Sequence, residues 1–217
     1  MSDTNKGRTL LHLARAAIAR ELGFRSDDLP RTSWLEQPGA TFVTLTLHGR
    51  MHGCIGSLEA RLPLIDDVRQ NAIAAAFEDP RYPPLTREEF ADVVIDVALL
   101  STPEEIHFRS EQDALQQLHP GLDGVTLEYD PAATATEQAD SGLLEQATVR
   151  ATAESAPLGR PNRATFLPHA WADLPEPRDY LAELKTQAGL PEDFWSDDIK
   201  LSRYTVKKWH EVERQHG

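Results

Sequence analysis

The sequence predicts an α+β fold with a mostly antiparallel sheet flanked by helices. Segments with helix and strand periodicity alternate along the 217 residues, and several are joined by short, hairpin-type connections. No Gly-x-Gly-x-x-Gly or phosphate-binding loop follows a strand-like segment, so a doubly wound nucleotide-binding fold has no support. The length suits one compact domain, or one domain with a small lobe.

The first part of the chain predicts a helix followed by a hairpin. Apolar residues recur at spacings of three and four between Leu10 and Leu22, which predicts a helix of roughly 15 residues that a glycine ends. A polar, proline-containing loop follows over residues 26–39. Residues 41–47 alternate and are rich in β-branched side chains, so they predict a strand. Residues 51–55 return as its partner after a turn that contains glycine.

The next part predicts a second helix, a stiff proline segment and a central strand. Two early aspartates and an apolar face predict a helix at about residues 63–78. Residues 81–85 are expected to be extended, because each residue before a proline is kept out of the α region. Residues 88–90 predict a short helical turn. Residues 93–100 are apolar on nearly both faces, which predicts a central strand covered on both sides.

The second half predicts short elements around a long insertion. Residues 112–118 and 177–188 predict helices, and residues 125–129, 163–167 and 199–206 predict strands. Residues 130–162 are rich in alanine and threonine and have almost no aliphatic periodicity, which predicts a flexible insertion or long loop. We expect residues 1–217 to form a single domain that this insertion interrupts.

The composition excludes several classes of protein. The 22 Lys and Arg against 35 Asp and Glu give a formal charge of −13, which argues against a nucleic-acid partner. No apolar run approaches the ~20 residues that span a bilayer, and residues 1–9 hold no apolar signal core, so we expect no membrane partner and a cytoplasmic location. One cysteine excludes a disulfide framework, and eight histidines without metal-ligand spacing predict no metal site and no cofactor.

The clearest chemical signal is the segment Gly53-Cys54-Ile55-Gly56-Ser57 at the end of the predicted hairpin. Its two glycines bracket the single thiol and leave the backbone open to close approach by another chain or a ligand. Gly53, Gly56 and Ser57 are therefore candidate substrate- or partner-binding residues. The alternative is that Cys54 is a small buried apolar residue and that the glycines serve the turn.

Cys54 is the candidate catalytic residue, because a thiol becomes a nucleophile when a base or a cation favours the thiolate. His52 is the second catalytic candidate, and Arg50 is a candidate binding residue and a possible source of positive charge. We expect His52 to lie opposite the Cys54 side chain and Arg50 to point to the same side as the sulfur. A bulge at the glycines would change which residue approaches it.

Two further segments hold candidate binding residues. After the second helix, prolines hold the chain rigid and present Asp79, Arg81 and Tyr82 at fixed orientations, which suits recognition of an anion or a carboxylate. An ordinary helix stop with a surface ion pair explains the same residues. His169 is a candidate acid, base or ligand, although a single histidine in an apolar segment is more often packed or hydrogen-bonded.

The remaining charged clusters are read as solvated surface. The acidic pairs at residues 27–28, 66–67 and 197–198 are expected in loops and at helix caps, and no pair of carboxylates is assigned to catalysis. Lys207-Lys208-Trp209-His210 is the only cluster of basic and aromatic residues, and it is too small against a charge of −13 to form a nucleic-acid surface.

Six segments, in this order, resemble the AMMECR1 domain family: MHGCIGSLEA, NAIAAAFEDPRYPPL, VVIDVALLSTPEEI, PGLDGVTL, RATFLPHAW and LKTQAGLPEDFW. The resemblance runs from Leu10 to Glu211 and points in particular to the bacterial and archaeal members called protein A of the AmmeMemoRadiSam system. The family's signature hexapeptide, Leu-Arg-Gly-Cys-Ile-Gly, corresponds to residues 51–56, with His52 at the position of its arginine.

The resemblance implies a larger lobe with an antiparallel sheet flanked by helices, a smaller second lobe and a cleft between them. It also implies a pathway shared with a Memo-like protein, similar to extradiol dioxygenases, and a radical SAM protein. The family has no established reaction, so two functions remain open. The first is an accessory component that binds a substrate or partner through the Cys54 strand and residues 80–84. The second is a cysteine-dependent enzyme that acts on a small-molecule or peptide ligand in the cleft.

Overall fold

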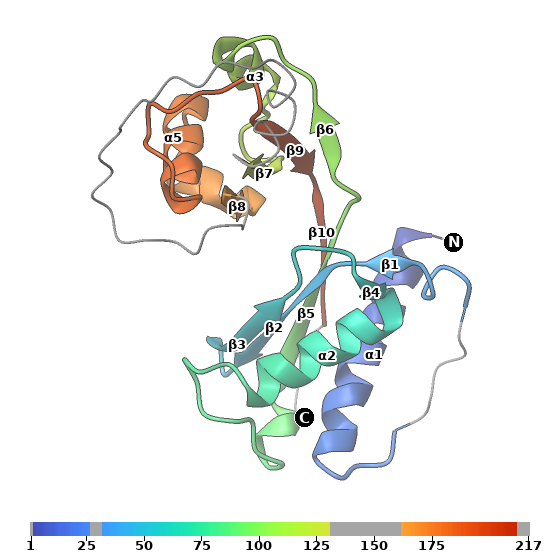
Figure 1. Cartoon of the computed structure of the whole chain (residues 1–217). Helices are drawn as coiled ribbons and strands as arrows, with labels where there is room; N and C mark the ends of the chain where they lie inside the picture. Colours follow the sequence, from blue (N-terminus) through green and yellow to red (C-terminus); the bar gives the residue numbers. More distant parts are fainter. Residues whose placement is uncertain (1, 27–31, 131–161, 212–217) are drawn as a thin grey trace, which may run out of the picture. The chain divides into compact units, whose positions relative to one another are not determined.

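The computed structural model describes residues 2–26, 32–130 and 162–211 (Figure 1). The chain divides into two compact units, and the fold class is α+β, as the sequence predicts. Unit 1 comprises residues 1–102 and 206–217, and unit 2 comprises residues 103–205. The predicted insertion at 130–162 lies almost wholly outside the described residues.

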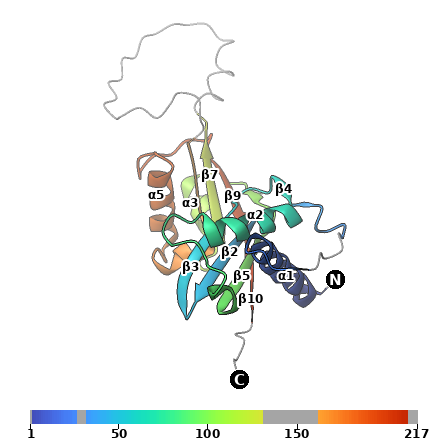
Figure 2. The same ribbon diagram turned by 90° about the horizontal axis from the view of Figure 1, so that it is seen from below.

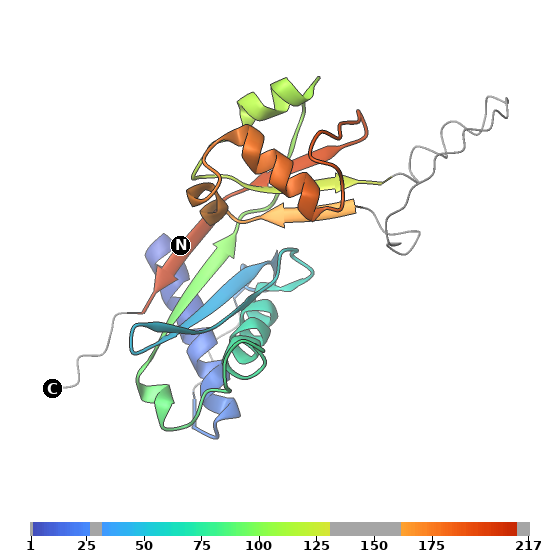
Figure 3. The ribbon, with the colours of Figure 1, turned by 90° about the vertical axis from the view of Figure 1, so that its left-hand side faces the viewer.

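Two helices cover one face of unit 1. α1 spans Asp3–Glu21 and so begins before the predicted apolar stripe, while α2 spans Leu64–Phe77, close to the prediction. α1 ends where Gly23 adopts a φ of 76°, a conformation that favours glycine. Both helices lie on the same side of the sheet and contribute their buried residues to one core with it (Figures 1 and 3).

The main sheet of unit 1 has four antiparallel strands in the order β10-β5-β2-β3. Its strands are β2 (Thr41–Leu47), β3 (Arg50–Gly56), β5 (Val93–Leu100) and β10 (Val206–His210). A small ladder of β1 (Pro38–Gly39) and β4 (Leu62–Pro63) and the 3-10 turn η1 (Glu89–Ala91) complete the described part of this unit.

β5 is central in the order of strands, but its burial differs from the prediction. Val93, Ile95 and Val97 are buried against the helices, whereas residues 94, 96 and 98 on the other face are only half-buried and Leu100, at the end of the strand, is buried. Helices α1 and α2 both cover the first face, so the expectation of full cover on both sides was wrong. The apolar run reflects one buried face and one half-buried face.

Unit 2 has its own antiparallel sheet and its own core. The strand order is β6-β9-β7-β8, and the strands are β6 (Glu104–Ile106), β7 (Gly124–Tyr129), β8 (Asn162–Phe166) and β9 (Lys200–Tyr204). The helical elements are α3 (Glu111–Gln117), the 3-10 turn η2 (Pro168–Ala172) and α5 (Pro177–Gln187), and α5 runs alongside the sheet (Figure 2). The ring of Trp171 stacks on that of Tyr180 with centroids 3.7 Å apart.

The last strand predicted at residues 199–206 corresponds to β9, and it reaches only the first residue of β10, a strand that the sequence analysis did not predict. β9 pairs with β7 and β6 in unit 2, and after Thr205 the chain continues as β10, which pairs with β5 in unit 1. β-periodicity is the same in both strands, so the sequence pattern does not mark the change of sheet. Among the described residues, no helix has the length and apolar character needed to cross a membrane.

Candidate functional site

The signature strand β3 carries a bulge that separates His52 from Cys54. Gly53 pairs with Leu45 and Met51 with Thr46, so His52 has no partner opposite it on β2. Cys54 pairs with Thr44 on the face away from the helices, whereas His52 is 8% exposed and lies 6.3 Å from the ring of Tyr82, measured between centroids. His52 therefore lies on the opposite face of β3 from the thiol, as expected. In a regular strand two residues this far apart would share a face, and the bulge at His52 separates them.

Arg50 does not share a face with the thiol. It pairs with Leu47, which packs against the helix-covered core, and alternation along β2 places Leu47 and Thr44 on opposite faces. The expectation that Arg50 points to the same side as the sulfur of Cys54 was wrong, because a one-residue bulge lies between them.

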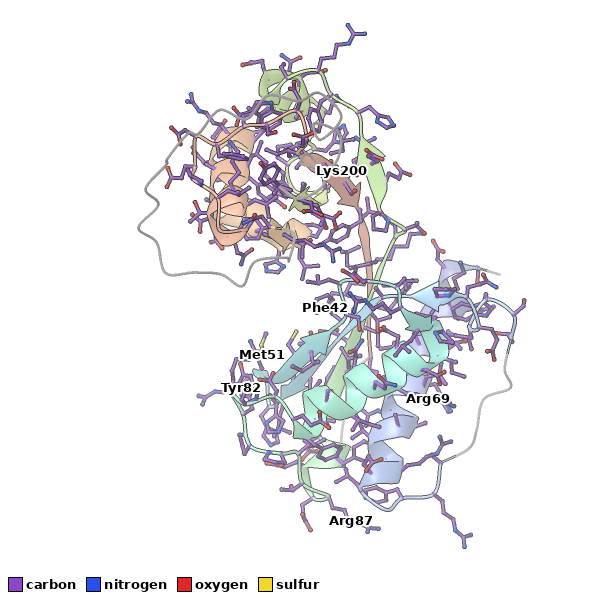
Figure 4. The ribbon with its side chains drawn as sticks, in the orientation of Figure 1. Phe42, Met51, Arg69, Tyr82, Arg87 and Lys200 are labelled. Atoms are coloured by element: carbon purple, nitrogen blue, oxygen red, sulfur yellow. The ribbon has the colours of Figure 1, made fainter. Side chains whose placement is uncertain are left out.

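The two signature glycines serve packing within the unit. A Cβ atom on Gly53 would lie 2.0 Å from the carbonyl oxygen of Ala75 in α2, and one on Gly56 would lie 2.3 Å from the ring of Phe42. Both positions exclude a side chain because neighbouring atoms of the same unit fill the space. The close approach anticipated at these glycines is thus made by α2 and Phe42 of the same unit. Figure 4 labels Phe42 on β2.

An ion pair from the proline segment holds the backbone of Cys54. The amide of Cys54 donates to Oδ2 of Asp79 at 2.9 Å, and Nη2 of Arg81 donates to the carbonyl oxygen of Cys54 at 2.9 Å. Arg81 also bonds to both carboxylate oxygens of Asp79, at 2.9 Å and 2.6 Å. We call this arrangement the Asp79–Arg81 clamp.

The clamp occupies hydrogen-bonding groups that an edge strand would otherwise expose. β3 is an edge of the sheet, and an unpaired edge amide and carbonyl form a template for another strand. Asp79 accepts a hydrogen bond from the Cys54 amide and Arg81 donates one to the Cys54 carbonyl, so these two groups are not available to an added strand. The turn Asp79–Tyr82, closed by the Tyr82 amide on the Asp79 carbonyl, presents both side chains. These residues therefore form a turn first, and the extended segment begins only after Tyr82.

The electrostatics of the clamp keep both groups charged. The hydrogen bond from Arg81 holds the pKa of Asp79 far below its usual range, and the backbone amides of Cys54 and Arg81 add to this effect against the opposing effect of burial. The same hydrogen bond raises the pKa of Arg81. Asp79 is only 4% exposed, so the alternative of an ordinary surface ion pair does not describe it.

The thiol of Cys54 is half-buried on the open face of the sheet. Oγ1 of Thr44 donates to its Sγ at 3.2 Å. The strand register continues this row from Thr44 to Asp96 and from Asp96 to His210, so thiol, hydroxyl, carboxylate and imidazole follow one another across four strands. Asp96 is paired with Lys208, with 3.1 Å between Nζ and Oδ2.

Sequence reasoning did not place Thr44, Asp96 or His210 in the site, and His210 was noted only as part of a small basic and aromatic cluster. Each lies on a different strand, and only the pairing register places them in one row with Cys54. Their distances from Cys54 along the sequence do not indicate that they lie in one row with it. The polar Asp96 inside an apolar strand was visible in the sequence and could have prompted the question of what it faces.

Most of the chain is similar to proteins of one family. A sequence profile of the AMMECR1 family matches residues 11–209. The chain belongs to the AMMECR1 family. A protein of Methanothermobacter thermautotrophicus is 32% identical to it over 213 residues, covering 95% of both chains, and one of Methanocaldococcus jannaschii is 32% identical over 164 residues, covering 75% of this chain and 67% of the relative.

A crystal structure of an AMMECR1-like fold agrees with this assignment. The uncharacterized protein from Pyrococcus horikoshii superimposes with a TM-score of 0.66 at 25% sequence identity, covering 97% of this chain and 94% of the other. The sequence and structure matches both extend over the two units of the chain, and they agree on the AMMECR1 family and on the α+β fold.

Ser57 of this AMMECR1-family chain belongs to a buried polar network beside β3. Oδ2 of Asp67 accepts from the amide and the hydroxyl of Thr41 at 2.8 Å and 2.7 Å and from Nδ2 of Asn71 at 3.0 Å. Asn71 also donates to Oγ of Ser57 at 3.1 Å.

Asp67 is 2% exposed, so the prediction that it is a solvated cap residue was wrong. Asp66, beside it, is half-buried, and residues 27–28 lie outside the described ranges.

Two histidines complete the list of predicted site residues. Nε2 of His52 is buried and has no hydrogen-bond partner within the described part of the chain, which marks an unsatisfied position beside Tyr82. His169 lies exposed in η2 of unit 2, whereas the other predicted site residues lie in unit 1. Within residues 2–26, 32–130 and 162–211, no cluster of histidine, cysteine and acidic side chains is arranged to hold a metal ion.

Proposed function

We propose that this AMMECR1-family protein is a binding component that presents the Cys54 strand to a substrate or partner protein. The observation that carries the proposal is the Asp79–Arg81 clamp, which fixes both main-chain groups of Cys54. A surface held in one conformation loses little conformational entropy when it binds, so such rigidity favours recognition. The resemblance to protein A of the AmmeMemoRadiSam system supports a Memo-like protein and a radical SAM protein as partners.

The surroundings of the sulfur favour binding over covalent chemistry. A catalytic thiol needs a base or a cation close to its sulfur, and the contact that the described residues make with Sγ is the neutral hydroxyl of Thr44. His52 lies on the opposite face of the strand. Asp79 and Arg81 are occupied with each other and with the backbone of Cys54. A nucleic-acid partner is disfavoured by the charge of −13.

Co-purification with the two partner proteins tests the proposal. Met51 pairs with Thr46 on the thiol's side of the sheet and is 51% exposed, so Met51→Glu changes that surface without removing a core residue. We expect this substitution to abolish capture of the Memo-like or radical SAM protein. Leu122→Glu is the matched control, because Leu122 is 56% exposed in unit 2. Failure of the wild-type protein to associate with either partner at micromolar concentration would contradict the proposal.

The second candidate is a cysteine-dependent enzyme that acts on a small or peptide-like substrate. The half-buried thiol favours this function, since the hydroxyl of Thr44 donates a hydrogen bond to Sγ. The guanidinium of Arg81 also places a positive charge at the backbone carbonyl of Cys54. Alkylation by iodoacetamide distinguishes the two functions. An enzyme loses turnover in parallel with Cys54 modification and in Cys54→Ser. A binding component retains partner capture in Cys54→Ser, and a thiol that resists alkylation in the native protein excludes the enzyme.

A further inference from the structure

β3 lies at an edge of the unit 1 sheet, and its residues lack the side chains that usually protect such an edge (Figure 1). Proteins keep edge strands from pairing with other molecules by means of charged side chains, prolines or a covering loop. Residues 51–57, Met-His-Gly-Cys-Ile-Gly-Ser, contain no proline, lysine, arginine, aspartate or glutamate. Short uncharged segments of this kind are prone to strand pairing when their edge is open. The protection of β3 therefore has to come from another part of the fold.

The main-chain groups of Cys54 show where this protection acts. The amide of Ser57 bonds to the carbonyl of Thr41, so Ser57 directs its main-chain groups toward β2. Alternate residues of an antiparallel strand point to opposite sides, so Gly56 is not in this set and both Gly56 and Cys54 direct their groups out of the sheet. Within the described residues, the outward groups of Gly56 make no hydrogen bond, whereas both groups of Cys54 are bonded to the clamp.

The Asp79–Arg81 clamp takes the place that an added strand would occupy at Cys54. It supplies one acceptor and one donor, each at 2.9 Å, which is an ordinary length for N–H···O bonds. Asp79 is 4% exposed and both of its oxygens bond to Arg81, so the cover is held in place. Two side chains offer no further row of main-chain groups, so the sheet ends at the clamp.

Without the clamp, β3 of a second copy of this chain matches the open edge. Antiparallel pairing about a two-fold axis would place Cys54 opposite Cys54 of the other copy, with about 5.5 Å between the Cα atoms. Each amide would then meet the carbonyl of the other copy, so all four groups that lose the clamp find partners. Like charges directly opposite each other oppose pairing, and residues 51–57 carry none.

We propose that the Asp79–Arg81 clamp is a cover for the β3 edge, which prevents a second copy of this chain from adding its own β3 to the unit 1 sheet. Removal of the clamp turns the edge into a two-fold interface between copies. This inference does not rest on the proposed function, which concerns the face of the sheet that carries the thiol and not its edge.

Sedimentation of a variant without the clamp tests the cover. Asp79→Ala/Arg81→Ala removes the acceptor, the donor and both charges together, so no unpaired charge is left behind. We expect this variant to dimerise at concentrations about tenfold below any at which the wild-type protein associates. Arg87→Ala is the matched control, because Arg87 is an exposed arginine of the same segment that lies 4.2 Å from the ring of Phe24. It should behave as the wild-type protein does.

Substitutions of Cys54 in the variant without the clamp identify the edge that pairs. Cys54→Pro removes an outward amide and no bond of the ladder with β2, so we expect it to restore the monomer. Cys54→Ala keeps the amide, and we expect the dimer to persist, which also excludes a disulfide as its cause. Hydrogen exchange of the residue 54 amide in that dimer should slow as the protein concentration rises.

A milder variant replaces the first if the alanine pair melts early in a thermal scan. Asp79→Asn/Arg81→Met keeps an acceptor for the Cys54 amide and most of the volume of the arginine stem, and it frees the Cys54 carbonyl alone. We expect it to dimerise about threefold more weakly than the alanine pair.

Three results would overturn the proposal. A folded variant that lacks the clamp and stays monomeric wherever the wild-type protein does would show that the clamp is not what closes the edge. A dimer that survives Cys54→Pro would place the contact on another surface. A wild-type dimer that Cys54→Pro dissociates would show that the clamp does not block pairing. None of these results changes the outcome of the Met51→Glu experiment, so the cover and the proposed function fail independently.

Discussion

Asp79 is buried as an ion because each of its oxygens has a partner. A buried carboxylate is strongly destabilising when it is unpaired, and tolerated when an ion pair and hydrogen bonds replace its hydration. Here Arg81 and the amides of Cys54 and Arg81 supply those bonds. The residue therefore links the end of α2 to the signature strand, and its charge is needed for both contacts.

Replacement of Asp79 by asparagine is expected to destabilise the fold in a pH-dependent manner. The substitution removes the partner of Arg81, so we expect the melting temperature at neutral pH to fall by several degrees. Because the native pKa of Asp79 lies below its unfolded value, the carboxylate contributes stability above the unfolded pKa and loses it as pH falls through the native one. The difference between wild type and Asp79→Asn should therefore shrink in acid.

Thermal unfolding at neutral and acid pH measures this difference. Glu88→Gln is the control, because Glu88 is an exposed carboxylate a few residues further along the chain. It should leave the melting temperature unchanged at both pH values. A wild-type advantage over Asp79→Asn that stays constant into strong acid would show that the clamp does not depend on the carboxylate charge.

At the scale of elements, the first turn of α2 holds two aspartates with different environments. Asp67→Ala removes the side-chain acceptor of the Thr41 amide and hydroxyl and one of several acceptors of the Asn71 side-chain amide, so we expect the free energy of unfolding to fall by roughly 3 kcal/mol. Asp66→Ala removes a favourable interaction with the helix dipole, for which we expect a loss of about 0.5 kcal/mol. Urea denaturation measures both values, and equal losses would contradict the role of the buried network.

The contact between β3 and α2 gives a second prediction about elements. Gly53→Ala places a methyl group against the Ala75 carbonyl of a packed helix, which cannot yield as a flexible side chain would. We expect a loss of about 3 kcal/mol in urea denaturation. Gly49→Ala is the control in the turn before β3, where only the φ of 74° opposes the substitution, at about 1 kcal/mol. A Gly53 variant as stable as the Gly49 variant would exclude the close approach.

Most elements follow from local patterns in the sequence. The β-branched alternation gives β2 at its observed bounds, and the apolar face of α2 places that helix within one residue at either end. The bulge at His52 and the burial of Asp67 do not follow. Both depend on which residue of another element lies opposite, and hydrophobic periodicity carries no information about that.

The candidate site depends on the arrangement of the whole unit. Cys54 and Asp79 are 25 residues apart, and α2 spans most of that separation before the chain returns to the β3 edge. The sequence indicated both segments as candidates from their residue types. It could not indicate that one clamps the other, because the length and direction of α2 decide where Asp79 arrives.

Unit 1 is discontinuous in sequence, since β10 joins it only after the chain has formed unit 2. This order means that the outermost strand of the unit 1 sheet comes from the last described residues of the chain. Trp209 packs on α1 at Gly7, and Glu211 bonds to the guanidinium of Arg15. The C-terminal residues therefore complete a core whose other parts all precede Pro103.

A chain that ends at Thr205 is expected to lose stability in unit 1 and not in unit 2. Removal of β10 exposes the edge of β5 and the surface that Trp209 covers, for which we expect a loss of about 3 kcal/mol or more. Hydrogen exchange should accelerate at the Val97 and Leu99 amides, which face β10, while Leu127 in unit 2 stays protected. Trp209→Ala should reproduce a smaller part of the effect in the full-length chain. Acceleration of equal size at Leu127 would contradict the expectation that the two units unfold independently. Unchanged exchange at Val97 would show that β10 is not needed for the unit 1 sheet.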